Sequence, residues 1–238
     1  MNLSKRLERL AGMVSPGNRL VDVGTDHGYV PICLCETKRI PSAIAMDVNE
    51  GPLLRAKSHI EEAGLIGYIQ TRLSDGLTAL KAGEGDSVLI AGMGGILMEK
   101  ILYEGRETLS SVRELILQPQ SDIAGIRQWL ERNDWQIIRE DIVIEDGKYY
   151  PMMKAVQGRG RTYTLPEYRY GRVELQQSLP VLENYLRKQI ETNEKILERL
   201  PKEGKERTLA REYFVRRDIR ILNEALEGCV LEQQKRNV

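Results

Sequence analysis

The sequence is poor in the residues that build disulfide frameworks and metal sites. Its 238 residues include three cysteines, two histidines, two tryptophans and one phenylalanine. Three cysteines cannot all pair with one another, and two histidines offer few ligands to zinc. We therefore expect no bound metal and a protein of a reducing compartment, the cytoplasm.

An excess of one charge and long apolar runs are also lacking. Lysine plus arginine and aspartate plus glutamate number 35 each, so no net field draws the whole protein to a polyanion. Any nucleic-acid surface must therefore be local. No segment reaches the roughly 18 uninterrupted apolar residues of a membrane helix, so we expect no membrane partner. A hydrophobic content of 41% is enough for a folded core.

Residues 1–157 alternate short β-branched runs with helical patterns. The runs are RLVDVG, SAIAMD, YIQTRLS, DSVLIAGM, ELILQPQ, WQIIREDIVIED and YYPMMKAV, with helices expected near 29–37, 51–63, 95–103 and 123–132. Strands that alternate with helices indicate an α/β fold with a mostly parallel sheet. Only Asp146-Gly147 joins the last two runs, which predicts an antiparallel hairpin at the end of the sheet. Rossmann-like methyltransferases share this outline with other α/β proteins.

Residues 158–238 have a different rhythm. A linker rich in glycine, proline and arginine, GRGRTYTLPEYRYGR, leads into apolar residues spaced by three, four and seven from Leu175 to Leu200. The PKEG segment, 201–204, interrupts the pattern, and a second stripe consists of Leu209, Phe214, Ile219, Leu222, Leu226 and Val230. The pattern predicts an antiparallel helical hairpin with arms about 35–40 Å long. We expect a monomer, and a homodimer stays open because the stripe could also pack against a second chain.

A glycine-rich turn, DVGTDHGYVP, follows the first expected strand. Gly24 and Gly28 permit a tight turn and a close approach of backbone to a ligand. Asp26 stands where a dinucleotide site of the G-x-G-x-x-G type has glycine, and its charge would repel a pyrophosphate. S-adenosylmethionine has no phosphate and carries two cationic groups, so Asp22 and Asp26 suit it better. The alternative is that Asp26 caps the helix that follows.

Three further loops follow successive strands. Asp47 lies about 20 residues after the glycine-rich turn, where an acidic residue can bind ribose hydroxyls. Asp75-Gly76 could face an adenine ring, and the glycines of Gly92-Met93-Gly94 would let backbone approach a ligand closely. Each has an ordinary alternative, a helix cap for Asp47 and turns for the other two. Together, the four loops predict one crevice at the carboxyl edge of the sheet.

The segments DVGTDHGYVP, AMDVNEGP, SDGL, IAGMGG and ILQPQ, with a helical hairpin behind them, resemble the bacterial tRNA (adenine-22-N1)-methyltransferase family, TrmK. The resemblance implies a Rossmann-like class I methyltransferase domain over 1–157 and a helical coiled-coil domain over 158–238. It also implies S-adenosylmethionine as cofactor and tRNA as substrate. By motif match, the cofactor-binding residues would be Gly24, Thr25, Asp26 and His27 at the methionine end, Asp47 and Val48 at the ribose, and Asp75 and Gly76 at the adenine, with Gly92, Met93 and Gly94 bordering the transfer site.

The chemistry of this reaction makes Asp26 the candidate catalytic residue. Adenine N1 has an in-plane lone pair and no proton to remove, so transfer needs alignment more than a general base. The product is a cationic adenine, which a nearby carboxylate stabilises. Asp26 could instead only position the cofactor, and both roles stay open.

Several basic and aromatic residues are candidates for RNA contact. Lys5, Arg6 and Arg9 can share one face of the first helix, although a solvated face would look the same. Tyr29 could stack on the target base or pack on the sheet, and Gln118-Pro119-Gln120 could border the base pocket or only end a strand. Arg161 and Arg169, interleaved with tyrosines in the linker, fit RNA contact and domain packing equally well.

Two other functions remain compatible with the sequence. The same fold could methylate a small molecule, with the hairpin as a lid or a dimer arm. It could also be a non-catalytic RNA-binding protein, although the acidic and glycine positions of all four loops argue against a fold that binds no cofactor.

Overall fold

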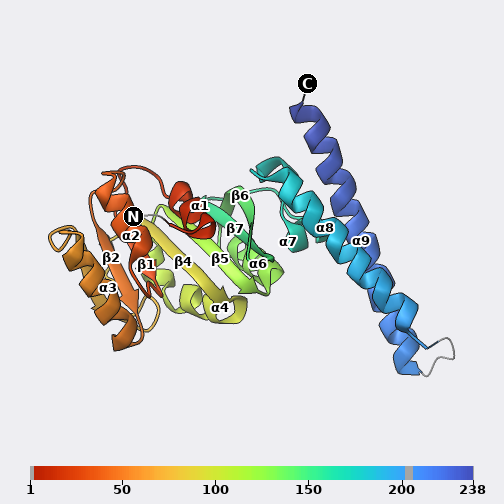
Figure 1. The fold of residues 1–238 in the computed structure, drawn as a ribbon, viewed down its shortest axis with the longest axis horizontal. Coiled ribbons are helices and arrows are strands. Elements are labelled where there is room, and N and C mark those ends of the chain that lie inside the picture. The colour runs from red at the N-terminus through yellow and green to blue at the C-terminus, as the bar shows by residue number, and fades with distance from the viewer. Residues whose placement is uncertain (1–2, 202–205, 238) are drawn as a thin grey trace. The chain divides into compact units, whose positions relative to one another are not determined.

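The computed structural model describes residues 3–201 and 206–237 (Figure 1). The chain folds into two compact units, Met1–Arg161 and Thr162–Val238. The boundary expected after residue 157 falls just before this division, at the end of the last strand.

Seven strands of the first unit form one sheet in the order β3-β2-β1-β4-β5-β7-β6. Strands β1 to β5 pair in parallel, and β7 pairs antiparallel with both β5 and β6. This confirms the α/β fold predicted from the strand and helix rhythm, with its antiparallel end. The strands are β1 (Leu20–Val23), β2 (Ala43–Asp47), β3 (Ile69–Leu73), β4 (Ser87–Gly94), β5 (Glu114–Ser121), β6 (Trp135–Glu145) and β7 (Lys148–Gln157).

Helices connect the parallel strands. From β1 to β3 each new strand is added on one side of β1, and from β4 to β5 strands are added on the other side. Because the connections are right-handed, α2 and α3 lie on one face of the sheet and α4 and α5 on the opposite face. The four-residue helix α5 is too short to show a sequence periodicity, and the patterns did not predict it. The helices are α1 (Lys5–Met13), α2 (Tyr29–Glu36), α3 (Glu50–Glu62), α4 (Gly95–Glu104), α5 (Arg106–Leu109) and α6 (Ile123–Arg132).

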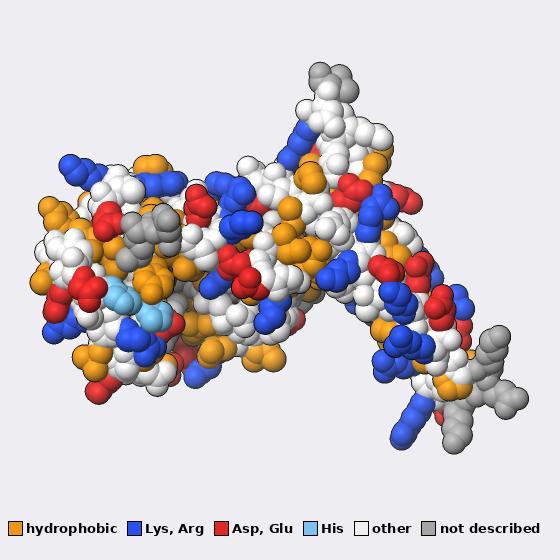
Figure 2. Space-filling model, in the orientation of Figure 1, with side chains coloured by type: hydrophobic (Ala, Val, Ile, Leu, Met, Phe, Trp, Pro, Cys, Tyr) orange, Lys and Arg blue, Asp and Glu red, His pale blue; other side chains and the backbone are white. Residues whose placement is uncertain are grey.

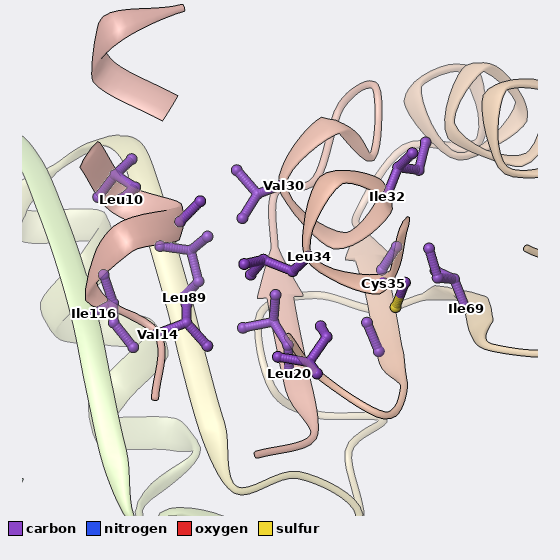
Figure 3. Packing of buried hydrophobic residues seen from close by; sticks show 14 of the residues in the cluster. Leu10, Val14, Leu20, Val30, Ile32, Leu34, Cys35, Ile69, Leu89 and Ile116 are labelled. Carbon is purple, nitrogen blue, oxygen red and sulfur yellow. The ribbon is translucent and has the colours of Figure 1, made fainter. Parts of the chain in front are cut away.

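The core on one face of the sheet joins α1 and α2 to the central strands. Figure 3 shows Leu10 of α1 and Leu34 of α2 approaching Leu20 of β1 and Leu89 of β4, and all four are at most 2% exposed. Burying side chains of this size contributes about 1.5–3 kcal/mol each. This packing holds the helices against the neighbouring strands β1 and β4. Successive strands are added to the sheet on one side of this pair up to β3 and on the other side from β4 onward. Such a switch point is where open α/β sheets bind their ligands.

The second unit contains a pair of long helices that lie side by side (Figure 1). At 1.5 Å per residue, the 21 residues of α8 and the 31 residues of α9 extend over roughly 31 and 46 Å. The prediction of two helices is confirmed, but that of equal arms is wrong, because α8 begins only after Leu175. Residues 202–204 of the PKEG segment lie outside the described residues. The elements are α7 (Leu165–Tyr170), the 3₁₀ turn η1 (Val173–Leu175), α8 (Leu179–Arg199) and α9 (Glu206–Arg236).

The stripe predicted for the second long helix is wrong at Leu209 and Phe214, whereas Ile219, Leu226 and Val230 are half-buried. Leu209 and Phe214 are 58% and 52% exposed, and of the predicted stripe only Leu222 is fully buried. The other buried positions of α9 are Ile221, Ala225 and Cys229. Ala225 and Cys229 are small, so the prediction chose the larger apolar residues that follow them, Leu226 and Val230. The predicted apolar face is therefore rotated by one residue from the buried face. Among the described helices, none is long and apolar enough to cross a membrane.

Candidate functional site

A cavity of about 430 Å³ opens at the switch point between β1 and β4. Its size falls within the roughly 300–1,000 Å³ of small-molecule sites. It brings together residues of the β1–α2 loop, the ends of β4 and β5, and helix α1. The lining residues are Arg6, Leu7, Asp22, Gly24, Thr25, Asp26, His27, Tyr29, Val30, Leu89, Ala91, Gly92 and Gln120.

Glycine shapes the loop that forms one wall of this cavity. Gly24 and Gly28 have φ of 75° and 70°, in the left-handed region that glycine adopts without strain. A Cβ on Gly24 would lie 2.3 Å from the Met93 Cε atom, so the loop packs against the flexible end of a side chain from β4. The N–H groups of Gly24 and Thr25 both donate to the Met46 carbonyl oxygen, at 2.8 and 3.0 Å, and tie the loop to β2.

Asp22 brings a buried negative charge to the cavity. It is 7% exposed, and its Oδ2 atom accepts a hydrogen bond of 2.6 Å from the Thr25 hydroxyl. Burial raises the pKa of Asp22 to about 6, against the opposing effect of the Thr25 hydrogen bond, and the Asp47 carboxylate raises it further. No ion pair joins Asp22 to another described residue. A cation placed in the cavity would therefore meet a carboxylate that no lysine or arginine of the described chain has neutralised.

Asp26 lies at the rim, with a side chain that is 57% exposed. Its Oδ1 atom accepts a hydrogen bond of 2.5 Å from Arg55 Nη2, and its Oδ2 atom lies 3.5 Å from His27 Nε2. Helix α2 is capped by Gly28 instead, so the alternative that Asp26 caps this helix is wrong. The partner Arg55 was not predicted, because its position on α3 is brought to the loop only by the fold.

Three aromatic rings stack beside the loop. The ring centroids of His27, Tyr29 and His59 are 5.0 to 5.4 Å apart and their planes are nearly parallel. His59 Nδ1 lies 3.0 Å from the His27 carbonyl oxygen, which links α3 to the loop. Figure 2 shows the two histidines of the chain together at the surface of the first unit. The stack holds the Tyr29 ring at the cavity wall.

The remaining residues assigned to the cofactor do not line this cavity. Asp47 ends β2, and its Oδ1 atom accepts a hydrogen bond of 2.9 Å from the Asn49 N–H. Asn49 is the residue that caps α3, so the alternative of Asp47 as the cap is also wrong. Asp75 is exposed after β3, with Lys100 Nζ 4.0 Å from its Oδ2 atom. The others in this group are Val48, Gly76, Met93 and Gly94, which follow or end β2, β3 and β4 along the same edge of the sheet.

Two of the three basic residues predicted to form a face of α1 interact with other residues of the protein. Arg6 Nη1 donates to Gln118 Oε1 at 3.0 Å and its guanidinium lies over the Tyr150 ring. Arg9 Nη1 is 3.2 Å from Asp141 Oδ2, whereas Lys5 is exposed. Of these three, only Arg6 lines the cavity.

The arginines of the linker have different surroundings. Arg169 pairs with Asp218 at 2.7 Å, which joins α7 to α9. Arg172 stacks on Tyr163, 3.9 Å from its ring centroid, and both are buried. Arg161 is exposed. RNA contact by Arg161 and Arg169 stays a prediction, although the ion pair gives Arg169 a structural role as well.

The apolar part of the wall was missed by the sequence analysis. Leu7, Val30, Leu89 and Ala91 line the cavity. Hydrophobic periodicity identifies such residues as core, and only the three-dimensional arrangement shows which of them border a cavity. Within residues 3–201 and 206–237, no group of three or more histidine, cysteine or acidic residues is arranged to hold a metal ion.

Comparisons with known proteins identify a methyltransferase family. The family model described as a methyltransferase domain matches residues 3–153. The Bacillus subtilis tRNA (adenine(22)-N(1))-methyltransferase is 40% identical over 158 residues, which is 66% of this chain and 66% of that protein.

Two solved structures extend the likeness over nearly the whole chain. The Bacillus subtilis m1A22 tRNA methyltransferase TrmK has a TM-score of 0.84 and 30% identity, covering 94% of this chain and 99% of its own. Streptococcus pneumoniae Sp1610, in complex with S-adenosyl-L-methionine, has a TM-score of 0.84 and 36% identity, covering 94% and 100%. The chain therefore belongs to the TrmK family of tRNA (adenine(22)-N(1))-methyltransferases.

Proposed function

We propose that this chain transfers the methyl group of S-adenosylmethionine to N1 of adenine 22 in tRNA. The observation that carries the proposal is the cavity at the switch point, with the buried Asp22 carboxylate in its wall. The named relatives are tRNA methyltransferases, which supports tRNA as the acceptor. None of them favours a small-molecule acceptor or a non-catalytic role.

The residues of the cavity fit S-adenosylmethionine. Asp22 and Asp26 contribute carboxylates to the cavity wall, which would attract the sulfonium and the ammonium group of the cofactor. The cofactor, when bound, supplies an electrophilic methyl group on a cationic sulfur. Asp47 and Asp75 follow the neighbouring strands at the same edge of the sheet, and by motif match they would bind the ribose and the adenine.

The chain needs to align the acceptor more than to move a proton. The N1 atom of adenine attacks with its own lone pair, so no general base is required. The apolar wall of Leu7, Val30 and Leu89 keeps water from the reacting atoms and strengthens the electrostatic effect of nearby charges. Because positive charge passes to the base, a carboxylate in the cavity stabilises it throughout transfer.

The two carboxylates divide these tasks. Arg55 neutralises Asp26, and solvent screens it further, so its charge is less effective on the reacting atoms. Asp22 is buried and has no such partner among the described residues. We assign the electrostatic role to Asp22 and a positioning role to Asp26, which ties the loop to α3 through Arg55.

The tRNA must present an accessible base, since N1 lies on the Watson–Crick edge. Tyr29, which stacks against the two histidines, lines the cavity and is our candidate to stack on this base. Lys5, Arg6 and Arg161 remain candidates for phosphate contact. We also propose a monomer, because the buried residues of α8 and α9 pack within one chain. The cytoplasm is the compartment that we propose for a chain with few cysteines and a tRNA substrate.

Transfer of labelled methyl from S-adenosylmethionine to unmodified bulk tRNA tests the proposal. Digestion of the tRNA to nucleosides and mass spectrometry should find the label in 1-methyladenosine. Asp26→Asn should raise the cofactor KM by about 10-fold and lower kcat less, because a positioning residue acts mainly on binding. Arg55→Ala, which removes the other half of the ion pair, should match it.

Two results would contradict these assignments. If S-adenosylmethionine binds but no nucleoside of the tRNA is labelled, tRNA is not the acceptor. A kcat for Asp26→Asn that falls by 100-fold or more, with an unchanged KM and a nearly normal Arg55→Ala, would assign the catalytic role to Asp26.

A further inference from the structure

The parallel pairing of β4 and β5 is interrupted twice at the carboxyl edge. Gly92 on β4 and Gln120 on β5 each lack a pairing partner, so each strand has a bulge. Bulges next to active sites re-aim side chains out of the regular alternation. The residues that do pair across this region are Ala91 with Gln118, Met93 with Pro119, and Gly94 with Ser121.

The two bulges bring Gln120 to the cavity. A Cβ built on Gly92 would lie 3.9 Å from Gln120 Nε2 and 3.9 Å from Arg6 Nη1, so these two polar groups flank the space above Gly92. Both residues line the cavity. Gln120 is exposed, and its carboxamide makes no hydrogen bond with any described residue.

Gln118 has the opposite environment. It is fully buried, its Nε2 atom donates to the Pro119 carbonyl oxygen at 3.2 Å, and its Oε1 atom accepts from Arg6. Its two groups are therefore occupied within the protein, and it fixes the Arg6 guanidinium. Of the two glutamines in the Gln118-Pro119-Gln120 segment, Gln118 holds Arg6 in place and Gln120 is available to a ligand.

We propose that the Gln120 carboxamide recognises the Hoogsteen edge of the acceptor adenine, an inference that rests on the proposed function. Its Oε1 atom would accept a hydrogen bond from the N6 amino group, and its Nε2 group would donate to N7, as glutamine does when it reads adenine in nucleic acids. This contact leaves the N1 lone pair free to face the methyl donor.

The contact also strengthens during transfer. The N1 lone pair forms the new N–C bond, the C–S bond breaks, its electron pair stays on sulfur, and no proton leaves. The positive charge gained by the base is shared with the N6 amino group. The hydrogen bond from N6 to Gln120 Oε1 therefore becomes charge-assisted, and this hydrogen bond is stronger in the transition state than in the substrate complex.

A chemical double-mutant cycle tests the N7 contact. Wild type and Gln120→Ala are compared on tRNA with adenosine or 7-deazaadenosine at position 22, which removes the N7 acceptor. On adenosine, Gln120→Ala should lower kcat/KM by about 10-fold or more. The 7-deaza substitution should then change kcat/KM of wild type and variant by clearly different factors, because the variant has no contact left to lose. Its effect on the basicity of N1 is common to both enzymes and cancels.

Gln120→Glu gives a second, opposite signature. A carboxylate accepts from N6 but repels the N7 lone pair, so this variant should be no better than Gln120→Ala on adenosine and better than it on 7-deazaadenosine. The control is Gln70→Ala, an exposed glutamine on β3 that contacts Arg72 and should behave as wild type in the cycle. Cofactor affinity of the Gln120 variants, measured by titration calorimetry, should equal that of wild type.

The outcomes separate this inference from the proposed function. If wild type forms 1-methyladenosine but the 7-deaza factor is equal in wild type and Gln120→Ala, the Gln120 contact is wrong and the function stands. Weakened cofactor binding by Gln120→Ala, with no coupling to N7, would place Gln120 in the cofactor site instead. Absence of 1-methyladenosine from the wild-type reaction overturns both.

Discussion

Replacing Gly92 with valine should lower methyl transfer by about 100-fold or more while the protein stays folded. The space above Gly92 is open, since the nearest atoms to an added Cβ are those of Arg6 and Gln120 at 3.9 Å. A valine side chain would occupy this space, which we assign to the acceptor base. A displacement of about 1 Å from the reactive geometry is enough for a loss of this size.

Valine at position 92 should also lower the stability of the protein, because the backbone there is left-handed. A matched control variant measures this effect alone. Gly92 has φ of 77°, where a β-branched residue is strained by about 1–2 kcal/mol. Gly83 has φ of 79°, and a Cβ there would meet no described atom within 4 Å. Gly83→Val, in the loop before β4 at the other edge of the sheet, should lose similar stability and keep its activity. Equal losses of activity in the two valine variants would show that strain, and not occupation of the cavity, causes the effect.

Replacing Asp22 with asparagine should stabilise the protein and weaken cofactor binding. Burial raises the pKa of Asp22 from 3.8 to about 6, which means that the ionised carboxylate costs about 2–3 kcal/mol of folding free energy at pH 7.5. Asparagine removes this charge and can still accept the hydrogen bond from Thr25. We expect a gain of about 1–2 kcal/mol in unfolding free energy and at least a 10-fold weaker affinity for S-adenosylmethionine, because the cationic cofactor loses its buried counter-charge.

The pH dependence identifies the group. The folded protein holds the Asp22 proton up to about pH 6 and the unfolded chain only to about pH 4, so this residue makes wild type less stable as pH rises through that window. Cofactor affinity should rise over the same window as the carboxylate ionises. Calorimetric titration at pH 5 and 7.5 should show this rise in wild type and not in Asp22→Asn. A variant that is less stable than wild type at pH 7.5, or that binds the cofactor equally well, would contradict the role given to Asp22.

The strand and helix pattern of the first unit could be predicted because its signals are local. Periodicity places the seven strands, and Asp146-Gly147 places the final hairpin. The sequence pattern did not predict the buried charged side chains between the sheet and its helices. Glu140 on β6 and Arg127 on α6 are at most 1% exposed and form an ion pair of 2.7 Å, which a pattern of polar residues facing solvent does not anticipate.

The site could be predicted in its location but not in its contacts. The glycine-rich turn marks the cavity because its glycines are needed for a left-handed backbone, a requirement that is visible in the sequence. The division between Asp22 and Asp26 is not visible, since it depends on burial in one case and on Arg55 in the other. The bulges that turn Gln120 toward the cavity are likewise a property of paired strands, which a single strand's sequence does not reveal.

The position of the transferred methyl group tests the central claim most directly. Unmodified tRNA with adenosine at position 22, and the same tRNA with guanosine there, would be incubated with enzyme and S-adenosylmethionine, cut with a guanosine-specific nuclease and sequenced by mass spectrometry. The account predicts one added methyl group, as 1-methyladenosine at position 22, and none in the guanosine tRNA. A methyl group at another position, or equal methylation of both tRNAs, would contradict it.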